Sequence, residues 1–499
     1  MSINLEHPEV QKREERLNSI SGFAGTAREL CDKSNSGKLC DKKRSFSQCL
    51  GCSSGNAICQ SIMIQDTVTI NHAPLGCAGD FADFNFTNRV NRGFRNLEIK
   101  NCRAISTNLE EKDTIYGGGD KLKKTIEMAY ARYKPKAIFV TASCASGIIG
   151  DDIESITNEE EEKLGIPVAY ISCEGFRSKL WTTGFDATFH GILRKIVKPP
   201  IKKQTDLINV INFWGSDIFT DLFKRLNLRP NYIVPFSTVE QLEKISEAAA
   251  TVQICPTLGT YLAAGLEQEY GVKEVKAPVP YGLKGTDNWF RELGKITGKE
   301  KEVEELIAEE KEKIAPKLEE LREKLKGKRA YVTAGAAHGH SIIALLKELG
   351  LEVTGAGIFH HDPKYDCDGA SRNRCCNGST ESLNHVVNTY GDVPNFHVCN
   401  KQAFELVNNL NRIKPDLLIA RHGGVSVWGI KLGIPTLLVG DEQFGLGYQG
   451  IINYGERILQ ILNTKEFSEN IASHALSPYS DWWLEQPANK FIDQLIIVK

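Results

Sequence analysis

The chain has no long apolar run and no excess of basic charge, and each absence narrows the range of functions. No apolar stretch approaches the roughly 18 residues that would indicate a membrane-spanning helix. The formal net charge of −2 shows no excess of basic residues, so we do not expect a nucleic-acid partner. The charged N-terminal segment lacks a secretory apolar region, and we therefore expect a cytoplasmic protein.

Motifs for nucleotide hydrolysis and zinc-protease chemistry are also missing, because the chain contains neither G-x-x-x-x-G-K-[ST] nor H-E-x-x-H. The segment V-T-A-G-A-A-H-G-H-S at 332–341 has the small residues of a dinucleotide-binding turn but not the G-x-G-x-x-G spacing. A nucleotide site there is a minor alternative. Any ATP-driven reduction would need a separate protein to hydrolyse the nucleotide.

Three cysteines stand beside small residues, and they are the most informative feature of the chain. Cys52 opens C-S-S-G-N-A-I-C, Cys77 ends N-H-A-P-L-G-C, and Cys144 opens C-A-S-G-I-I-G-D-D. Cys77 and Cys144 follow strand-like runs, and open α/β sheets carry their chemistry at the ends of strands. Thiolates framed by small residues suit an iron–sulfur cluster. Since a self-contained cluster usually takes four thiolates, the three cysteines predict a cluster shared with a second polypeptide.

The total of 14 cysteines favours metal ligation over a disulfide framework in a long cytoplasmic chain. Four of them fit better as small buried residues without a metal, namely Cys31, Cys40, Cys102 and Cys399.

Short β-branched runs alternate with helical stretches along the chain, which predicts an α/β fold of doubly wound parallel sheets. Near-continuous apolar runs are typical of strands buried on both faces. The predicted strands include 137–143, 168–172, 207–214, 232–237, 251–255, 330–335, 353–359, 416–420 and 436–440.

Composition predicts the domain limits. A polar arm covers 1–45, and the proline- and lysine-rich stretch 196–205 reads as a linker. Charges of both signs at helical spacing over 299–328 predict an exposed helix that connects domains. We therefore predict an interface-cluster domain at 46–200, a middle domain at 201–325 and a C-terminal domain at 326–499.

Two further strand ends carry candidate cofactor-binding residues. Cys255 closes the strand T-V-Q-I-C and precedes a turn into a helix, so it is either a core residue or the thiolate that holds a second cluster. Arg177 ends C-E-G-F-R after the strand V-A-Y-I-S and could face an anionic cofactor group.

Three histidine groups follow strands late in the chain. They are His338 with His340, His360 with His361, and His422. Equivalent strand ends favour convergence on one crevice, where imidazoles ligate metals or relay protons. A polar loop at 366–379 brings together cysteines and arginines, which suits extra metal ligation, redox switching or a tolerated surface insertion; these residues are Cys367, Arg372, Arg374, Cys375 and Cys376.

The sequence resembles the α-type subunit of nitrogenase component 1, the dinitrogenase family. The matching segments are N-H-A-P-L-G-C, L-E-E-K-D-T-I-Y-G-G, C-A-S-G-I-I-G-D-D-I-E, C-E-G-F-R and G-Y-Q-G-I-I-N-Y-G-E-R. They run from about residue 48 to 462, and the match is most specific over 52–177.

The resemblance implies three Rossmann-like domains around a central cofactor crevice and an α2β2 heterotetramer. Cys52, Cys77 and Cys144 match the α-side ligands of the P-cluster, an [8Fe-7S] or [4Fe-4S] type of cluster shared with a homologous β subunit. Cys49 and Cys59 compete for the first position. Cys255 matches the cysteine that holds the larger active-site iron–sulfur cofactor. Electrons would come from a separate ATP-hydrolysing iron protein.

The sequence departs from dinitrogenase at two histidines. The family's second cofactor ligand is a histidine shortly before the G-Y-Q-G-like segment, where 435–447 has none. The histidine that assists dinitrogen reduction is also missing, because the aligned stretch S-K-L-W-T-T-G-F-D places Phe185 or Asp186 there and Trp181 towards the cofactor. His361 or His422 is a candidate substitute ligand. The same two histidines and Asp362 are candidate proton donors.

These observations predict a nitrogenase-like reductase subunit that performs an ATP-dependent, multi-electron reduction of a small molecule. The substrate is dinitrogen or, given the altered pocket, a methylthio compound whose carbon–sulfur bond is reduced, as in the nitrogenase-like methylthio-alkane reductases. The alternative is a scaffold on which the nitrogenase cofactor is assembled. The C-E-G-F-R motif favours the catalytic subunit, whereas the missing second ligand favours the scaffold.

Overall fold

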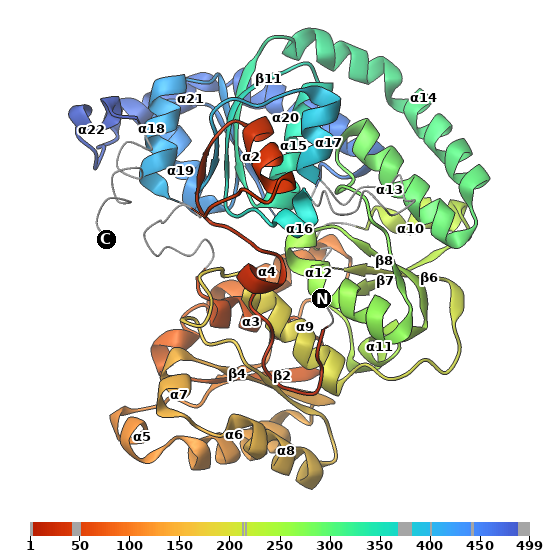
Figure 1. Cartoon of the computed structure of the whole chain (residues 1–499), viewed down its shortest axis with the longest axis vertical. Helices are drawn as coiled ribbons and strands as arrows, with labels where there is room; N and C mark the ends of the chain where they lie inside the picture. The colour runs from red at the N-terminus through yellow and green to blue at the C-terminus, as the bar shows by residue number, and fades with distance from the viewer. Residues whose placement is uncertain are drawn as a thin grey trace. The chain divides into compact units, whose positions relative to one another are not determined.

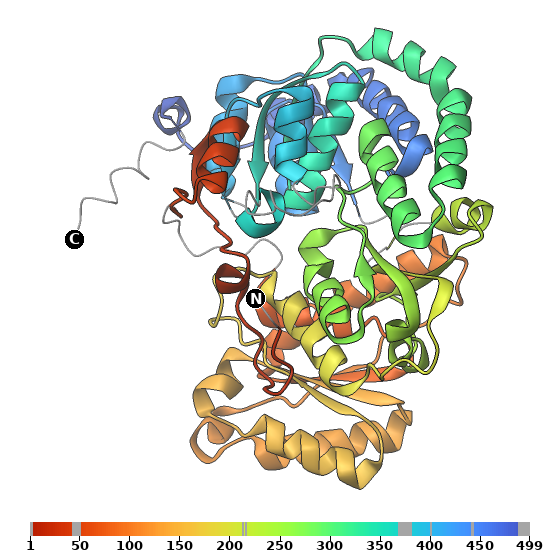
Figure 2. The same ribbon diagram turned by 45° about the vertical axis from the view of Figure 1, so that its right-hand side comes forward.

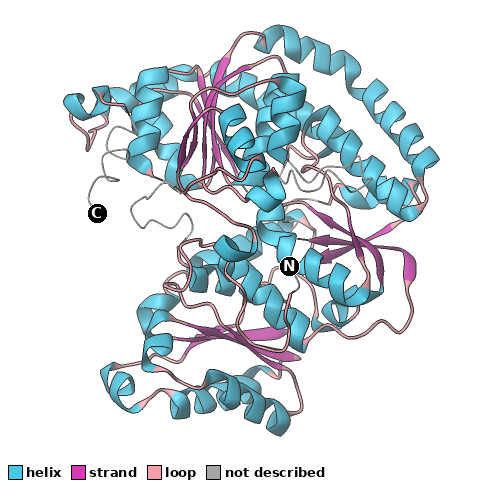
Figure 3. Cartoon of the chain, in the orientation of Figure 1, coloured by secondary structure: helices cyan, strands magenta, loops and turns pink. Residues whose placement is uncertain are grey.

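The computed structural model describes residues 3–41, 51–211, 214, 217–367, 382–399, 402–440 and 444–487. It divides into two compact units. The first unit contains Met1–Arg16 with Leu50–Val275, and the second contains Leu17–Cys49 with Lys276–Lys499. Figure 3 shows the strands of each unit gathered into sheets between helices.

The first unit begins with a four-stranded parallel sheet in the order β3-β2-β4-β5. Its strands are β2 (Thr67–His72), β3 (Ala104–Ser106), β4 (Ala137–Ala142) and β5 (Val168–Ile171). All residues of β2 and β4 are buried. Helices cover both faces, with α6 (Gly119–Tyr133) and α8 (Ile153–Leu164) on one and α3 (Ser53–Ser61) and α9 (Thr183–Lys195) on the other (Figure 1). Burial on both faces explains why these strands lack a polar alternation.

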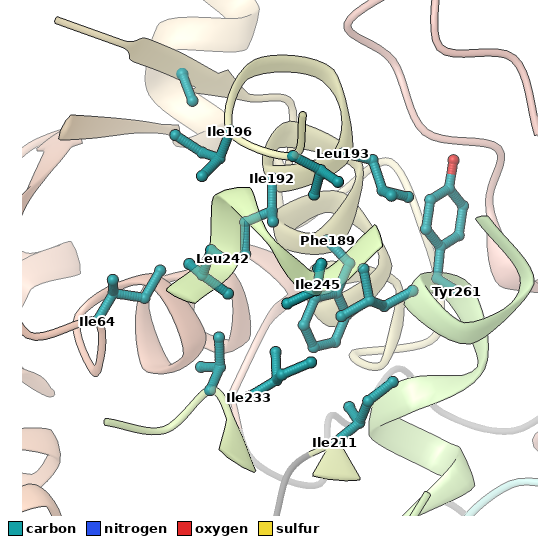
Figure 4. Close-up of a cluster of buried hydrophobic side chains, with 14 of the residues drawn as sticks. Ile64, Phe189, Ile192, Leu193, Ile196, Ile211, Ile233, Leu242, Ile245 and Tyr261 are labelled. Atoms are coloured by element: carbon teal, nitrogen blue, oxygen red, sulfur yellow. The ribbon is translucent and has the colours of Figure 1, made fainter. Parts of the chain in front are cut away.

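A second parallel sheet in this unit has the order β7-β6-β8-β9. Its strands are β6 (Gln204–Ile211), β7 (Arg229–Ile233), β8 (Ala248–Gln253) and β9 (Lys273–Glu274). Helix α9 packs against α12 (Pro256–Tyr270), and their apolar faces join one buried cluster with the strands. Figure 4 shows Phe189 and Ile192 of α9 among Ile211, Ile233 and Tyr261. Helices α9 and α12 therefore share a rigid core.

The second unit is built on a six-stranded sheet in the order β1-β12-β11-β10-β13-β14. Its strands are β1 (Phe23–Gly25), β10 (Arg329–Ala334), β11 (Glu352–Ile358), β12 (Phe396–Val398), β13 (Leu417–Arg421) and β14 (Thr436–Val439). Only the edge strand β1 pairs antiparallel. The chain leaves β10 towards β11 on one side and later returns to β13 on the other. The point between β10 and β13 is therefore the topological switch point, where open α/β sheets bind ligands.

Helices cover both faces of the six-stranded sheet (Figure 1). The long helix α14 (Glu300–Leu325), green in Figure 2, packs on α13 (Gly282–Thr297) and α20 (Gly447–Leu462). The other helices of this unit are α2 (Ala27–Asn35), α15 (Ala336–Glu348), α16 (Pro363–Asp366), α17 (Ser382–Tyr390), α18 (Ala403–Ile413), α19 (Gly423–Lys431), α21 (Lys465–His474) and α22 (Asp481–Glu485). The first unit also has α1 (Arg13–Arg16), α4 (Phe81–Phe94), α5 (Glu111–Tyr116), α7 (Cys144–Ile149), α10 (Phe219–Arg225), α11 (Val239–Glu243) and the 3₁₀ turns Leu75–Ala78 and Ile245–Glu247.

The three doubly wound sheets confirm the predicted fold class, whereas the four domain limits stay predictions. The predicted strand at 232–237 is displaced, because β7 covers Arg229–Ile233. Pro235 has no N–H to donate to a ladder, so the strand ends before it. The helix predicted over 299–328 is α14, although one of its faces is buried. None of the helices in the described ranges has the length and apolarity needed to cross a membrane.

Candidate functional site

The three predicted cluster cysteines lie in the first unit, two at the start of helices and one within a short 3₁₀ turn. Cys52 is the N-cap residue of α3, Cys77 lies in the turn Leu75–Ala78 after β2, and Cys144 is the first residue of α7 after β4. Strands β2 and β4 are parallel neighbours, with His72 opposite Ala142 at their ends. Their carboxyl ends therefore deliver Cys77 and Cys144 to the same edge of the sheet.

Gly175 lies directly against two of these thiols. A Cβ atom on Gly175 would be 2.8 Å from Cys52 Cβ, 3.1 Å from Cys52 Sγ and 3.3 Å from Cys144 Sγ. Burial raises the pKa of the Cys77 thiol, and the neighbouring Cys52, Cys144 and Asp80 raise it further. The three thiols are thus close enough to influence one another, and Gly175 leaves the space between two of them open.

These donors fit an iron–sulfur cluster better than a single ion. In the described ranges, no three His, Cys, Asp or Glu side chains converge so as to hold one metal ion. Spread thiols around a space kept open by glycine suit a cluster of several irons. Bound iron cations would offset the repulsion between the sulfurs and would hold the cysteine thiols as thiolates.

The competing cysteines are placed differently. Cys59 lies seven residues after Cys52 on α3, about 10 Å along the helix axis. Cys49 lies outside the described residues, as do Cys375 and Cys376 of the polar loop. Among the described cysteines of this region, Cys52 is the one that shares the contact of Gly175 with Cys144.

Exposed apolar side chains stand next to the three cysteines along the chain. Leu75 is 65% exposed, Ile148 is 78% exposed and Phe176 is 54% exposed. Each is within four residues of Cys77, Cys144 or Gly175. Ile115 and Tyr116 of α5, which packs on α7, are exposed as well. Large apolar side chains gathered on a surface are typical of a protein interface.

Cys255 is buried in the first unit as the N-cap residue of α12, with Pro256 in the first turn. The N-terminus of this 15-residue helix favours a thiolate, because the helix dipole is positive there. The local structure therefore fits Cys255 as a metal ligand.

Asp186, one of the two residues predicted at the position of the missing histidine, forms part of a buried ion-pair network. Asp186 is fully buried, with Arg13 Nη2 2.5 Å from Oδ1 and Arg16 Nη2 2.9 Å from Oδ2. Arg16 also donates to Thr260 Oγ1 on α12 at 3.0 Å. Trp181 packs edge to face on the Phe185 ring at 5.7 Å. Asp186 thus fixes residues near the N-terminus to α9 and α12.

Arg177 is engaged by carboxylates of the first unit. Its Nη2 lies 2.5 Å from Glu9 Oε2, and its Nη1 lies 3.3 Å from Glu174 Oε2. Burial lowers the pKa of Arg177, but the two carboxylates outweigh it and leave a net increase. The arginine is therefore part of an ion-pair network, and a cofactor-facing role stays a prediction.

His360 and His361 are buried after β11 in the second unit. His361 Nε2 lies 3.2 Å from Ser34 Oγ, and its Nδ1 lies 3.4 Å from Asp366 Oδ2. His360 Nδ1 lies 3.1 Å from Asp362 Oδ1. Both ring nitrogens of His361 face partners within its own unit.

The other two histidine groups lie on either side of the switch point. His338 is buried in the first turn of α15 after β10, and its Nδ1 lies 3.2 Å from the Tyr281 hydroxyl. His422 is the half-buried N-cap residue of α19 after β13, with a positive φ of 80°. Burial lowers the pKa of His338 well below its usual value, and Arg421 and His422 lower it further. The predicted convergence is therefore partial, with His338 near His422 and His340 near His360 and His361.

Sequence reasoning missed three features of these sites. The position of Gly175 beside two thiols was not predicted, although the motif C-E-G-F-R contains this glycine. Arg13 and Arg16, the partners of Asp186, stand in an arm with no pattern that indicates burial. It did not single out His338 Nε2, which has no hydrogen-bond partner among the described residues.

Several known proteins are similar to this chain. The nitrogenase molybdenum-iron protein alpha chain of Methanosarcina barkeri is 32% identical over 319 residues, which cover 61% of this chain and 58% of that protein. The match thus spans less than two thirds of that relative's length. The nitrogenase iron-molybdenum cofactor biosynthesis protein NifE of Methanococcus maripaludis is 27% identical over 460 residues, covering 88% of this chain and 90% of that protein.

The fold has a counterpart among solved structures. The structure described as nitrogenase Cp1 at pH 6.5 matches with a TM-score of 0.68 and 22% identity, covering 88% of this chain and 92% of that one. The family model for nitrogenase component 1 type oxidoreductases matches residues 52–463, which include all three cluster cysteines and Cys255. The chain therefore belongs to the nitrogenase component 1 type oxidoreductase family.

Proposed function

We propose that this chain is the α-type catalytic subunit of a nitrogenase-like component 1, which reduces a small molecule on a buried iron–sulfur cofactor. The observation that carries the proposal is the proximity of three thiols: Cys52 and Cys144 both lie beside Gly175, and both are near enough to Cys77 to raise its pKa. Exposed apolar side chains next to these cysteines support a shared cluster covered by a homologous β-type subunit. The assembly would be an α2β2 heterotetramer in the cytoplasm.

The chain would hold two metal centres. Cys52, Cys77 and Cys144 would supply the α-side thiolates of a P-cluster-type centre, and Cys255 would hold the active-site cofactor. These groups store and deliver electrons, which would come from an ATP-hydrolysing iron protein. The protein's own part is to fix Cys52, Cys144 and Cys255 at helix N-termini and Cys77 in a 3₁₀ turn, and to keep water out through the shared core of α9 and α12.

The altered pocket favours a substrate other than dinitrogen, such as a methylthio compound, although dinitrogen stays a candidate. Asp186 is held as a carboxylate by two arginines, which disfavours it as a proton donor in place of the missing histidine. His422, half-buried at the N-terminus of α19, is the better candidate for proton delivery than His361, whose ring nitrogens face Ser34 and Asp366.

A cofactor assembly scaffold is the second candidate. The likeness to NifE covers 88% of the chain, and the segment 435–447 contains no histidine that could serve as the second cofactor ligand. A scaffold holds its cofactor in order to release it, so a weaker ligand set suits that role.

One experiment separates the two functions. The chain is purified anaerobically with its β-type partner, and iron content is measured together with reductase- and ATP-dependent turnover of dinitrogen, acetylene and methylthio compounds. Sustained turnover that is lost in Cys255→Ala but kept in Cys399→Ala supports the catalytic subunit. Bound cofactor without turnover, but with transfer to a cofactor-free dinitrogenase, supports the scaffold. Background iron contradicts both.

A further inference from the structure

Two buried thiols meet in the second unit, away from the cysteines of the candidate site. Cys31 lies in the middle of α2, and Cys367 is the C-cap residue of α16. Their sulfur atoms are 3.5 Å apart, although 336 positions separate the two residues along the chain. Both side chains are buried, and both residues belong to the same compact unit.

Other bonds fix the segments that carry the two thiols against each other. Strand β1, which precedes α2, pairs with β12 of the six-stranded sheet. Ile20 and His361 exchange two backbone hydrogen bonds of 2.9 and 3.0 Å. Ser34 Oγ of α2 lies 3.2 Å from His361 Nε2, and α2 also packs on α17. The sulfur contact is therefore part of a well-bonded association between α2 and the rest of the unit.

The Cys31 sulfur lies at the centre of a small hydrogen-bonded group. The Cys367 thiol donates to it, Asn35 Nδ2 donates to it at 3.8 Å, and its own thiol donates to Asn384 Oδ1. Asn35 is exposed and also donates to Asn384 Oδ1 at 3.1 Å. The sulfur thus lies beneath an exposed side chain, and displacement of that side chain opens a path to a small oxidant.

The pair suits a disulfide better than a metal ion. In the described ranges, no group of three His, Cys, Asp or Glu side chains could hold a metal ion, so the two thiols lack a third ligand there. A disulfide joins its sulfurs at about 2.05 Å, which requires these two to approach by about 1.5 Å through side-chain rotation. Disulfides in cytosolic proteins are usually transient and serve catalysis or redox sensing.

We propose that Cys31 and Cys367 form a modification site, at which a hydroperoxide produces an intramolecular disulfide. Hydrogen peroxide oxidises one thiol to a sulfenic acid: the O–O bond breaks, one oxygen stays on the sulfur, and the other leaves as water. The second thiol then attacks the sulfenic sulfur, so that the S–S bond forms, the S–O bond breaks and a second water leaves. The two sulfurs lose two electrons, and the peroxide gains them.

The product ties α2 covalently to the end of α16. A cross-link that closes a long loop restricts the unfolded chain more than the folded one. We therefore expect the oxidised protein to melt several degrees above the reduced protein. The inference does not depend on the proposed function, because it concerns thiols that hold no cluster.

The test uses the anaerobically purified complex with its partner, treated with a small molar excess of hydrogen peroxide and stopped with catalase. Remaining thiols are alkylated in denaturant, and mass spectrometry of the digest identifies cross-linked peptides. Denaturing electrophoresis without reductant gives a second readout, because a chain closed into a large loop migrates faster. The variants are Cys31→Ser and Cys367→Ser, and the matched control is Cys399→Ser, since Cys399 is also buried in this unit. Metal content is measured before oxidation.

We expect a peptide that joins Cys31 to Cys367 in most chains and a faster band that dithiothreitol reverses. Both should be lost in Cys31→Ser and Cys367→Ser and kept in Cys399→Ser. If the serine variants do not fold, the peptide map of the parent still decides. Recovery of both cysteines as thiols from the oxidised, folded complex overturns the proposal, as does a disulfide that forms only after unfolding in urea. A metal bound to the parent and lost in both serine variants also overturns it. Background iron removes the proposed function and leaves this test unchanged.

Discussion

Replacing Gly175 by alanine adds one methyl group where two thiols already stand. The new Cβ would lie 2.8 Å from Cys52 Cβ, a separation that real Cβ atoms do not show, and 3.3 Å from Cys144 Sγ. Gly175 is not among the glycines with positive φ, so alanine brings no backbone strain there. Any effect must therefore come from the contact with the two cysteines.

The size of the effect follows from packing. Forcing one methyl group against side chains that are already within contact distance costs about 1–3 kcal/mol. For a unit of about 150–250 residues, each kcal/mol lowers the melting temperature by about 2–4 °C. We expect Gly175→Ala to lower the melting temperature by several degrees. We also expect it to reduce the iron bound at the interface cluster severalfold, because Cys52 and Cys144 must separate to make room.

Gly76→Ala is the matched control. Gly76 is next to Cys77, has no positive φ, and a Cβ there meets no atom within 4 Å. The assay measures iron per chain, visible absorbance, partner co-purification and thermal melting of both variants under anaerobic conditions. Full iron content and full partner binding in Gly175→Ala would refute the placement of the cluster between Cys52 and Cys144, as would equal losses in both variants.

Three further predictions concern other parts of the chain. Asp186→Asn leaves two buried guanidinium groups without their carboxylate, so urea unfolding should show a decrease of about 3–5 kcal/mol in the free energy of unfolding. The control Asp206→Asn breaks an exposed ion pair and should cost no more than about 1 kcal/mol. Equal decreases in the two variants would contradict the buried network. Cys144→Ala should lose the interface cluster and the partner, whereas the buried Cys399→Ala should keep both, and a Cys144→Ala protein with full absorbance and partner would disprove the assignment. Burial lowers the pKa of His190 to about 4, from 6.5, so the unfolded state binds the proton first. The free energy of unfolding should therefore fall as the pH drops from 6.5 to 4, by up to about 3 kcal/mol from this group, and His190→Gln should flatten that part of the profile.

The parts of the fold that could be predicted are those whose signal is local. Strands β4, β10 and β11 are buried on both faces, so their apolar runs mark them directly. The three-residue strands β1 and β12 give no such signal, because pairing with each other and with β11 defines them. Helix α14 was visible from its charges, but its buried face depends on helices more than a hundred residues away, such as α20.

The residues of the candidate site also differ in whether the local sequence or only the tertiary structure indicates their role. Cys52, Cys77 and Cys144 are recognisable because each cysteine begins or ends a motif of small residues, and a resemblance covers all three. Their mutual approach is a tertiary fact that depends on the register of β2 against β4. The burial of Asp186 has no local signal either, since its partners Arg13 and Arg16 lie about 170 residues earlier in the chain.

The histidines show most clearly why sequence alone leaves the chemistry open. Their positions at strand ends make His338, His361 and His422 equally good candidates for metal ligands, because all three follow neighbouring strands of one sheet. Their contacts are similar in kind: His338 Nδ1 lies 3.2 Å from the Tyr281 hydroxyl and His361 Nε2 lies 3.2 Å from Ser34 Oγ, whereas the second ring nitrogen of each has no hydrogen-bond partner among the described residues. A hydrogen bond uses up one ring nitrogen, so a buried imidazole can bind a metal only if its remaining nitrogen has no other partner. His338 and His361 both meet this criterion, so neither strand position nor hydrogen bonding alone selects one of them as a ligand.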